Sequence, residues 1–196
     1  DCESVLKNIH GIIVAPGFGS RGIEGKIKAV HYARTKKIPF LGICLGMQCA
    51  VVEFARNVLK MENANSIEID SKTKFPVISR MEEQKKLKKM GGTMRLGAYK
   101  CDIEKETLLH KIYKKETILE RHRHRFEFNN KYVKEFESKG LIFSGKNSKN
   151  QLMETIEIKD HPWFIGVQYH PEYKSTVENP HPIFLGLIEA GLKQSL

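Results

Sequence analysis

Hydrophobic positions alternate between two kinds of spacing in the first part of the chain. Apolar runs at 11–15 and 38–43 have the length and composition of short buried strands. Each run is followed by apolar positions at helical spacing, at 24–35 and 47–60. A strand–helix–strand–helix series favours a parallel sheet with helices on both of its faces. We therefore expect a three-layer α/β/α fold with a mixed, mostly parallel central sheet.

The remainder of the chain predicts more strands, separated by two helices and a loop. The expected strands are 66–70, 91–102, 141–144, 152–158 and 163–168, the last three of antiparallel type. The expected helices are 104–115 and 129–139. The Lys-rich stretch 71–90 is expected to be a mobile loop.

The turn between the second strand and the second helix carries a cysteine. Cys44 stands between Gly42 and Gly46, which remove the Cβ atoms that would clash in a sharp turn. A strand-to-helix turn of this kind is a nucleophile elbow, here with Cys in place of Ser. Amide dipoles at the helix N-terminus favour a thiolate. A buried structural cysteine is the alternative interpretation of so short a motif.

A general base and an orienting group follow near the end of the chain. His170 ends another apolar run, and Glu172 comes two residues later, after Pro171. A nucleophilic cysteine needs a base, and the base needs a group that orients it. Cys44, His170 and Glu172 therefore predict a catalytic Cys-His-carboxylate set.

The G-x-C-x-G turn and the His-Pro-Glu motif resemble those of the class I, triad-type glutamine amidotransferases. The resemblance extends from about Ile12 to about Leu192. His181 and the residues after it resemble the family's final helix, in which His181 is expected to be a cap or a surface residue. Four further stretches match one member of the family closely: Met61–Ser66, Gly91–Gly97, Glu120–Glu127 and His161–Phe164. The resemblance implies that residues 1–196 form one glutaminase domain with the family's fold.

The resemblance also implies roles for individual residues in the hydrolysis of L-glutamine through a glutamyl-thioester. Arg125 would bind the substrate α-carboxylate, and Glu68 its α-ammonium group. Gln48 would bond the polar head or the amide. The oxyanion would be held by the N–H groups of Gly17 and Leu45. Gly17 lies in a loop where Ala15-Pro16-Gly17 replaces the family's usual Pro-Gly-Gly. The expected glutamine-binding residues are Gly17, Leu45, Gly46, Met47, Gln48, Glu68 and Arg125.

The family member with these stretches is a ligase that uses the released ammonia in a second domain. The resemblance implies an N-terminal synthetase domain, not present in this chain, which starts at Asp1 without an initiator Met. In that domain UTP is phosphorylated by ATP with Mg²⁺ and aminated to CTP, and GTP activates the whole enzyme. We expect no cofactor in the present chain, and a homotetramer for the full-length enzyme.

Composition limits the partners that the chain is expected to have. Lys and Arg number 33 against 23 Asp and Glu, a net charge of +10. The excess is concentrated in 71–90 and 105–125, and the first run lacks interleaved aromatic residues, so no nucleic-acid partner is expected. No apolar run reaches the ~18 residues of a membrane span, so no membrane partner is expected. The four cysteines lack metal-type spacing, and a cytoplasmic location is expected.

The alternating histidines His122 and His124 should share one face of a strand, but no further ligand has suitable spacing for zinc. We therefore expect anion recognition by Arg125 here and no metal. Three other functions stay open: another class I amidotransferase or a γ-glutamyl hydrolase, a catalytically silent regulatory module, and a basic nucleic-acid binder.

Overall fold

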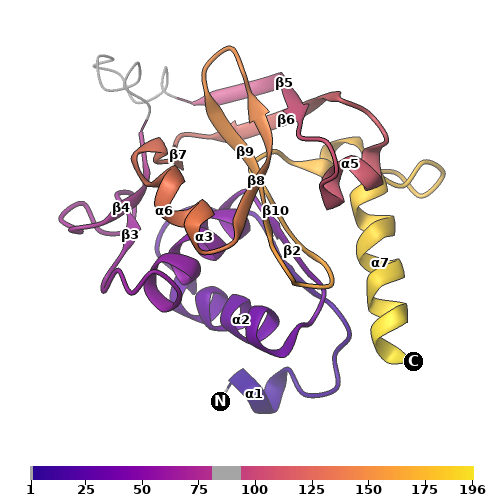
Figure 1. Cartoon of the computed structure of the whole chain (residues 1–196), viewed down its shortest axis with the longest axis horizontal. Coiled ribbons are helices and arrows are strands. Elements are labelled where there is room, and N and C mark those ends of the chain that lie inside the picture. Colours follow the sequence, from indigo (N-terminus) through magenta and orange to yellow (C-terminus); the bar gives the residue numbers. More distant parts are fainter. Residues whose placement is uncertain (1, 81–93) are drawn as a thin grey trace.

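The computed structural model describes residues 2–80 and 94–196, and its centre is a curled seven-stranded sheet (Figure 1). The strand order across the sheet is β1-β2-β10-β9-β8-β5-β6. The strands are β1 (Ile12–Val14), β2 (Phe40–Ile43), β10 (Phe164–Val167), β9 (Leu152–Ile158), β8 (Leu141–Asn147), β5 (Arg95–Ile103) and β6 (Thr117–His124).

The sheet is mixed, as the sequence predicts, but the prediction that it is mostly parallel is wrong. Within this sheet only the pairs β1–β2 and β2–β10 are parallel. The pairs β10–β9, β9–β8, β8–β5 and β5–β6 are all antiparallel. Short connections join β8 to β9 and β9 to β10, and parallel neighbours would need long crossover connections instead. The helical crossovers are confined to the first part of the chain, where the alternating pattern is found.

Helices cover both faces of the sheet, so the three-layer prediction is confirmed. On one face lie α2 (Ile23–Lys36) and α3 (Leu45–Asn57), and on the other lie α5 (Leu108–Tyr113) and α7 (Pro182–Ser195) (Figure 1). Alternate residues of β2 belong to the two hydrophobic clusters: Phe40 packs with the α2 and α3 side chains, and Leu41 with those of α5 and α7. Both side chains are completely buried.

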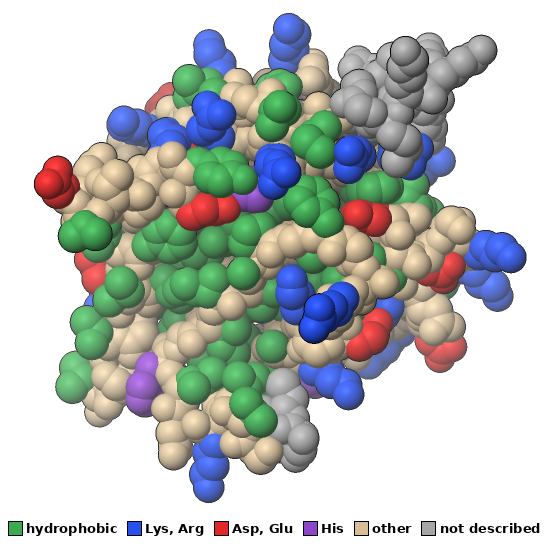
Figure 2. Space-filling model, turned by 180° about the vertical axis from the view of Figure 1, so that it is seen from behind, with side chains coloured by type: hydrophobic (Ala, Val, Ile, Leu, Met, Phe, Trp, Pro, Cys, Tyr) green, Lys and Arg blue, Asp and Glu red, His purple; other side chains and the backbone are tan. Residues whose placement is uncertain are grey.

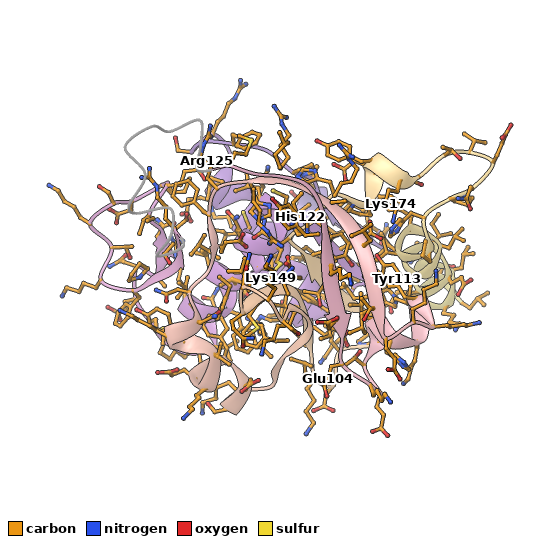
Figure 3. The ribbon with its side chains drawn as sticks, turned by 90° about the horizontal axis from the view of Figure 1, so that it is seen from above. Glu104, Tyr113, His122, Arg125, Lys149 and Lys174 are labelled. Atoms are coloured by element: carbon orange, nitrogen blue, oxygen red, sulfur yellow. The ribbon has the colours of Figure 1, made fainter. Side chains whose placement is uncertain are left out.

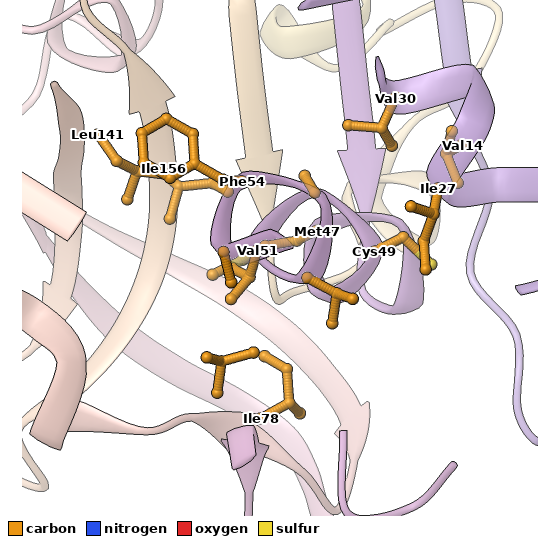
Figure 4. Packing of buried hydrophobic residues seen from close by; sticks show 14 of the residues in the cluster. Val14, Ile27, Val30, Met47, Cys49, Val51, Phe54, Ile78, Leu141 and Ile156 are labelled. Carbon is orange, nitrogen blue, oxygen red and sulfur yellow. The ribbon is translucent and has the colours of Figure 1, made fainter. Parts of the chain in front are cut away.

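Helix α3 is the most enclosed of these elements. Figure 4 shows its side chains Met47, Val51 and Phe54 among residues of α2 and of the sheet, including Ile27 and Ile156. Every residue of α3 from its start through Ala55 is buried. Because α3 is packed on all sides, the turn that leads into it is held firmly against the sheet.

The remaining elements are short. A small second sheet has the order β3-β4-β7, in which β4 pairs with β3 in parallel and with β7 in antiparallel orientation. The elements outside the central layers are α1 (Cys2–Val5), β3 (Asn65–Ser66), β4 (Pro76–Ser79), β7 (Glu127–Phe128), η2 (Asn130–Tyr132), α6 (Val133–Ser138) and η3 (Pro171–Lys174).

Two of the expected elements differ from the structure around Ser66. The expected strand 66–70 is wrong beyond Ser66, because the Ser66 side chain accepts a bond from the N–H of Glu68 and its carbonyl accepts from Ile69 and Asp70. These bonds close a turn, which is a frequent role of serine. The expected loop 71–90 contains strand β4, while its residues 81–90 lie outside the described residues, as do 91–93 of the expected strand 91–102.

The two expected helices in the second half are shorter than the sequence predicts. Helix α5 starts only after Thr107, whose side chain caps it by accepting from the N–H of His110. The helix expected at 129–139 consists of η2 followed by α6. His181 is the N-cap of α7, as predicted, because its ring accepts from the N–H of Ile183, but it is buried rather than on the surface.

Positive side chains are spread over the face of the molecule that Figure 2 shows. Lys and Arg side chains lie along its upper edge and also near its centre, among hydrophobic side chains. Within residues 2–80 and 94–196, no helix has both the length and the apolar character needed to cross a membrane.

The sharp turn at Cys44 depends on two close backbone approaches. Cys44 has φ 52° and ψ −102°, outside the regions that most residues adopt. A Cβ atom on Gly42 would lie 2.7 Å from the carbonyl carbon of Gly46, and one on Gly46 would overlap the carbonyl oxygen of Val14. The glycines that the sequence pattern singled out are therefore required sterically, since these contacts are with backbone atoms.

We expect Gly46→Ala to destabilise the fold by at least about 3 kcal/mol, because neither the Val14 carbonyl nor α3 can move aside. Gly25→Ala is the matched control, because Gly25 also lies near the start of a helix but an added Cβ meets nothing there. The control should stabilise by about 0.5–1 kcal/mol. Urea unfolding of the two variants checks this, and equal midpoints would show that the approach to Val14 is not tight.

Candidate active site

One pocket brings together half of the residues that the sequence predicts to bind and react with substrate, and His170 and Glu172 are not among those that line it. It is lined by Gly17, Phe18, Cys44, Gln48, Glu68, His124, Arg125 and Phe126. Cys44 lies at the end of β2, Gln48 in the first turn of α3, and Arg125 directly after β6. The pocket therefore lies where the β2–α3 turn, the Gly17 loop and the end of β6 meet.

Cys44 is buried at the base of this arrangement, with only 3% of its surface exposed. Its backbone N–H donates to the carbonyl of Val167 at 2.7 Å, which ties the turn to the end of β10. Burial raises the pKa of the Cys44 thiol to about 12; a bond from the Leu45 N–H opposes the rise, and the charge of Glu127 adds to it. The expected stabilisation of thiolate by the start of α3 is therefore present but outweighed by burial.

His170 and Glu172 form a close pair next to the turn. Nδ1 of His170 lies 2.6 Å from Oε1 of Glu172. A carboxylate can only accept, so Nδ1 carries the proton, and Nε2 of a neutral ring offers a lone pair. Nε2 is buried and has no hydrogen-bond partner among the described residues, so no bond joins it to Cys44 Sγ. The ring of Tyr173 stacks on the His170 ring, with their centroids 4.8 Å apart, a contact that the sequence reasoning missed.

Three predicted residues at the start of α3 differ in their relation to the pocket. The N–H of Leu45 bonds to the sulfur of Cys44, and the Leu45 side chain lies against Gly17, 3.2 Å from where a Cβ would stand. Gly46 contacts the backbone of Val14, and the Met47 side chain is fully buried in the core. None of Leu45, Gly46 and Met47 is among the residues that line the pocket.

Opposite charges face the same pocket from two loops. Arg125 and Glu68 are both half-buried, and both line the pocket. In Figure 3 Arg125 lies just beyond the strand that carries His122. A guanidinium and a carboxylate on either side of a small pocket suit a zwitterionic ligand.

A buried glutamine that the sequence reasoning missed contacts the sulfur. Nε2 of Gln168 donates to Cys44 Sγ at 3.6 Å, and Oε1 of Gln168 accepts from Nε2 of Gln48 at 3.2 Å. Gln48 also donates to the Phe126 carbonyl at 3.0 Å, so its amide nitrogen is committed to protein partners. The available signal was the place of Gln168, two residues before His170 on the same strand end.

A buried charged cluster lies behind the pocket. Arg95 donates to both oxygens of Glu154, at 3.1 and 2.5 Å, and to Glu127 at 3.3 Å. Burial opposes the charged form of Arg95, but its bonds and charge contacts with Glu154 outweigh burial and raise its pKa. His124 Nε2 lies 2.8 Å from Glu127, which connects the cluster to the pocket wall. These contacts give Arg95 a structural part in the buried cluster.

His122 and His124 share one face of β6, as predicted. Their ring centroids are 5.1 Å apart, and both rings are buried. Burial lowers the pKa of His122 well below its usual range, with Arg95 contributing, so the ring is neutral. Within the part of the chain that the structure describes, no group of three or more His, Cys, Asp or Glu residues is arranged to hold a metal ion.

Comparison with known proteins gives a consistent result. The family model described as glutamine amidotransferase class-I matches residues 1–190. The chain therefore belongs to the class-I glutamine amidotransferase family.

Within that family the similarity is to CTP synthase. The chain is 60% identical to the CTP synthase of Flavobacterium psychrophilum and 56% identical to that of Christiangramia forsetii, over 97% of its own length in each case. It covers 36% and 35% of those proteins, and so spans about a third of the length of the curated relatives. A solved glutaminase domain of Trypanosoma brucei CTPS with bound acivicin superposes with a TM-score of 0.92 and 38% identity, covering 97% of this chain and 74% of that one.

We expect Arg95→Met to destabilise the protein by about 3–5 kcal/mol, because it leaves Glu154 and Glu127 buried without their cationic partner. Lys100→Met on the same strand is the control, because Lys100 is exposed and its loss should change stability by less than about 0.5 kcal/mol. Thermal unfolding of both variants measures the difference. Similar melting temperatures would mean that the buried cluster contributes nothing to the fold.

Proposed function

We propose that this chain is the glutaminase domain of a CTP synthase and hydrolyses L-glutamine to L-glutamate and ammonia. The observation that carries the proposal is the pocket in which Cys44, Glu68 and Arg125 meet. In a class-I glutamine amidotransferase, this pocket offers a nucleophile and two charges complementary to an amino acid. The related Trypanosoma brucei domain holds acivicin, which supports a small ligand at such a site.

Substrate binding follows from the charges of the pocket. Arg125 would donate two parallel hydrogen bonds to the α-carboxylate of glutamine, and Glu68 would bind the α-ammonium group. The side chain of glutamine would then extend toward Cys44, along the backbone of Leu45, Gly46 and Met47. Gln48 would act chiefly by positioning its neighbours, because its amide nitrogen is already bonded twice.

The chemistry would begin with proton transfer from the Cys44 thiol to Nε2 of His170, since burial disfavours an isolated thiolate. Sulfur attacks the amide carbon, and the N–H groups of Gly17 and Leu45 hold the oxyanion. Each such donor is worth roughly 3–4 kcal/mol in other enzymes. The C–N bond breaks as His170 gives its proton to the departing ammonia. Water deprotonated by His170 then attacks the thioester, which releases glutamate and restores the thiol, while Glu172 orients the ring throughout.

The chain corresponds to only part of the relatives' length, so the rest of the activity belongs to the whole protein. We extend the proposal to residues 1–196 as the glutaminase domain, which supplies ammonia to an N-terminal synthetase domain for ATP-dependent amination of UTP to CTP. ATP, Mg²⁺ and UTP would bind in that domain, GTP would activate the whole enzyme, and the glutaminase domain would need no cofactor. A cytoplasmic homotetramer without nucleic-acid or membrane partners completes the proposal.

We expect Cys44→Ala to abolish glutamine hydrolysis without unfolding the protein, because the pocket loses its nucleophile. Cys49→Ala is the matched control, because Cys49 is equally buried and burial raises its pKa to about 12 as well, but it lies in α3 away from the pocket. Glutamate release measures activity. A glutamine-analogue electrophile followed by mass spectrometry should label Cys44 and spare Cys49; hydrolysis that survives in Cys44→Ala would refute the proposal.

We expect His170→Ala to lose far more activity than Glu172→Gln. In a serine protease, loss of the base costs roughly 10⁶-fold in turnover and loss of the orienting carboxylate roughly 10⁴-fold. Glu172→Gln keeps a partner for Nδ1 of His170, so most of the ring's position is retained. His110→Ala, in α5, is the control and should leave turnover unchanged. Unimpaired turnover by His170→Ala would remove the histidine from the mechanism.

A further inference from the structure

A chain of buried amides connects the wall of the pocket to the nucleophile. It runs from the carbonyl of Phe126 through Gln48 to Gln168 and ends at Cys44 Sγ, with separations of 3.0, 3.2 and 3.6 Å. The two glutamines are 4% and 0% exposed, so water does not compete for their bonds. Such buried polar chains persist only when their members are paired with one another.

The direction of every bond in this chain is fixed by its first member. A backbone carbonyl can only accept, so the group of Gln48 that faces Phe126 must be its NH₂. The same nitrogen faces Gln168, which must therefore present its oxygen to Gln48. The remaining group of Gln168, its NH₂, is then turned to the sulfur of Cys44. The sulfur receives a hydrogen-bond donor because of a carbonyl that lies three bonds away in the chain.

We propose that Gln168 is a positioning residue for the nucleophile: its amide holds Cys44 Sγ and stabilises the thiolate, in an orientation set by the carbonyl of Phe126. For glutamine turnover this inference rests on the proposed function, but the effect on the sulfur does not. Hydrogen bonds to a charged acceptor are about twice as strong as neutral ones, so the bond strengthens when the thiol ionises. Among the described contacts of the sulfur, the only other donor is the N–H of Leu45.

The backbone around Gln168 leaves its side chain little freedom. Its N–H donates to the carbonyl of Glu154 at 2.8 Å, and the preceding residue, Val167, accepts the N–H of Cys44 at 2.7 Å. Both glutamine and nucleophile are thus attached to the same strand end. Phe126, at the far end of the chain, directly follows Arg125, so a ligand that shifts Arg125 also shifts the carbonyl that orients the two amides.

The test is the pH profile of Cys44 alkylation by iodoacetamide, read peptide by peptide with mass spectrometry on the whole chain. Alkylation reports the thiolate and needs no glutaminase activity, so failure of the proposed function would leave this measurement intact. In Gln168→Leu, which keeps the size but not the donor, the profile should move to higher pH by about one unit. This corresponds to about tenfold less thiolate at a fixed pH on the rising limb.

Two further variants separate a role at the sulfur from a role in folding. Gln168→Glu keeps the shape but turns a carboxylate to the sulfur, so its profile should move further than that of Gln168→Leu. Ser144→Ala removes another fully buried hydrogen bond, to Thr155 at 2.9 Å, and should leave the profile unchanged. Melting temperatures identify folded variants.

If Gln168→Leu does not fold, the pH profile of Gln168→Glu tests the inference in its place. Gln48→Leu gives a second measurement: it frees the amide of Gln168 to rotate, so the profile should move to higher pH by a smaller amount. A profile that stays in place in a folded Gln168 variant would overturn the inference, and so would a shift of equal size in Ser144→Ala.

Discussion

The contact between the first turn of α3 and the end of β1 is the constraint on which the site depends. Gly46 lies so close to the Val14 carbonyl that no side chain fits between them. At this approach the chain turns sharply at a single residue, and Cys44 has a positive φ with ψ −102°, an uncommon backbone conformation. Because β2 is central among the parallel strands, this turn delivers the sulfur beside the end of β10, from which Gln168 and His170 extend.

The antiparallel part of the sheet, from β9 through β8 and β5 to β6, positions a different set of pocket residues. It places Arg125 and Phe126 opposite the elbow, at the end of β6, and the Arg95–Glu154 pair holds the middle of that part. Buried ion pairs contribute little net stability compared with apolar side chains of the same volume, but they are highly specific about register. A shift of β5 along its neighbour β8 would move Arg95 away from Glu154 and Glu127 and leave two carboxylates unpaired in the interior. The charged cluster thus helps to hold the segment after β6, with Arg125 and Phe126, in place relative to Cys44.

Local signals in the sequence were sufficient for the elbow, the His170–Glu172 pair and the three layers, because each depends on neighbours in the chain or on simple periodicity. The antiparallel type of β8, β9 and β10 was predicted correctly. The share of parallel strands was overestimated, because β5 pairs with both β6 and β8 in antiparallel orientation and strand direction depends on connection length and neighbours rather than on apolar content. The alternation of polar and apolar residues predicted a strand that continues to residue 70. The strand ends at Ser66 instead, because the Ser66 side chain and carbonyl accept bonds that close a turn. The bond between Gln168 and Cys44 joins residues 124 positions apart, and only the folded chain reveals it.

The tight approach at Gly46 also has an evolutionary consequence. A position that excludes every side chain cannot drift, and a residue held in a left-handed conformation between two glycines can change little without loss of the fold. In the loop that carries Phe18 the packing is looser: an added Cβ on Gly17 would lie 3.2 Å from the Leu45 side chain, and one on Gly19 would meet nothing within 4 Å. Under the proposed function, descendants of this scaffold can therefore bind new substrates by altering the pocket loops that carry Phe18, Glu68 and Arg125, while Cys44 keeps its place. Divergence in specificity and preservation of chemistry follow from the same packing contact.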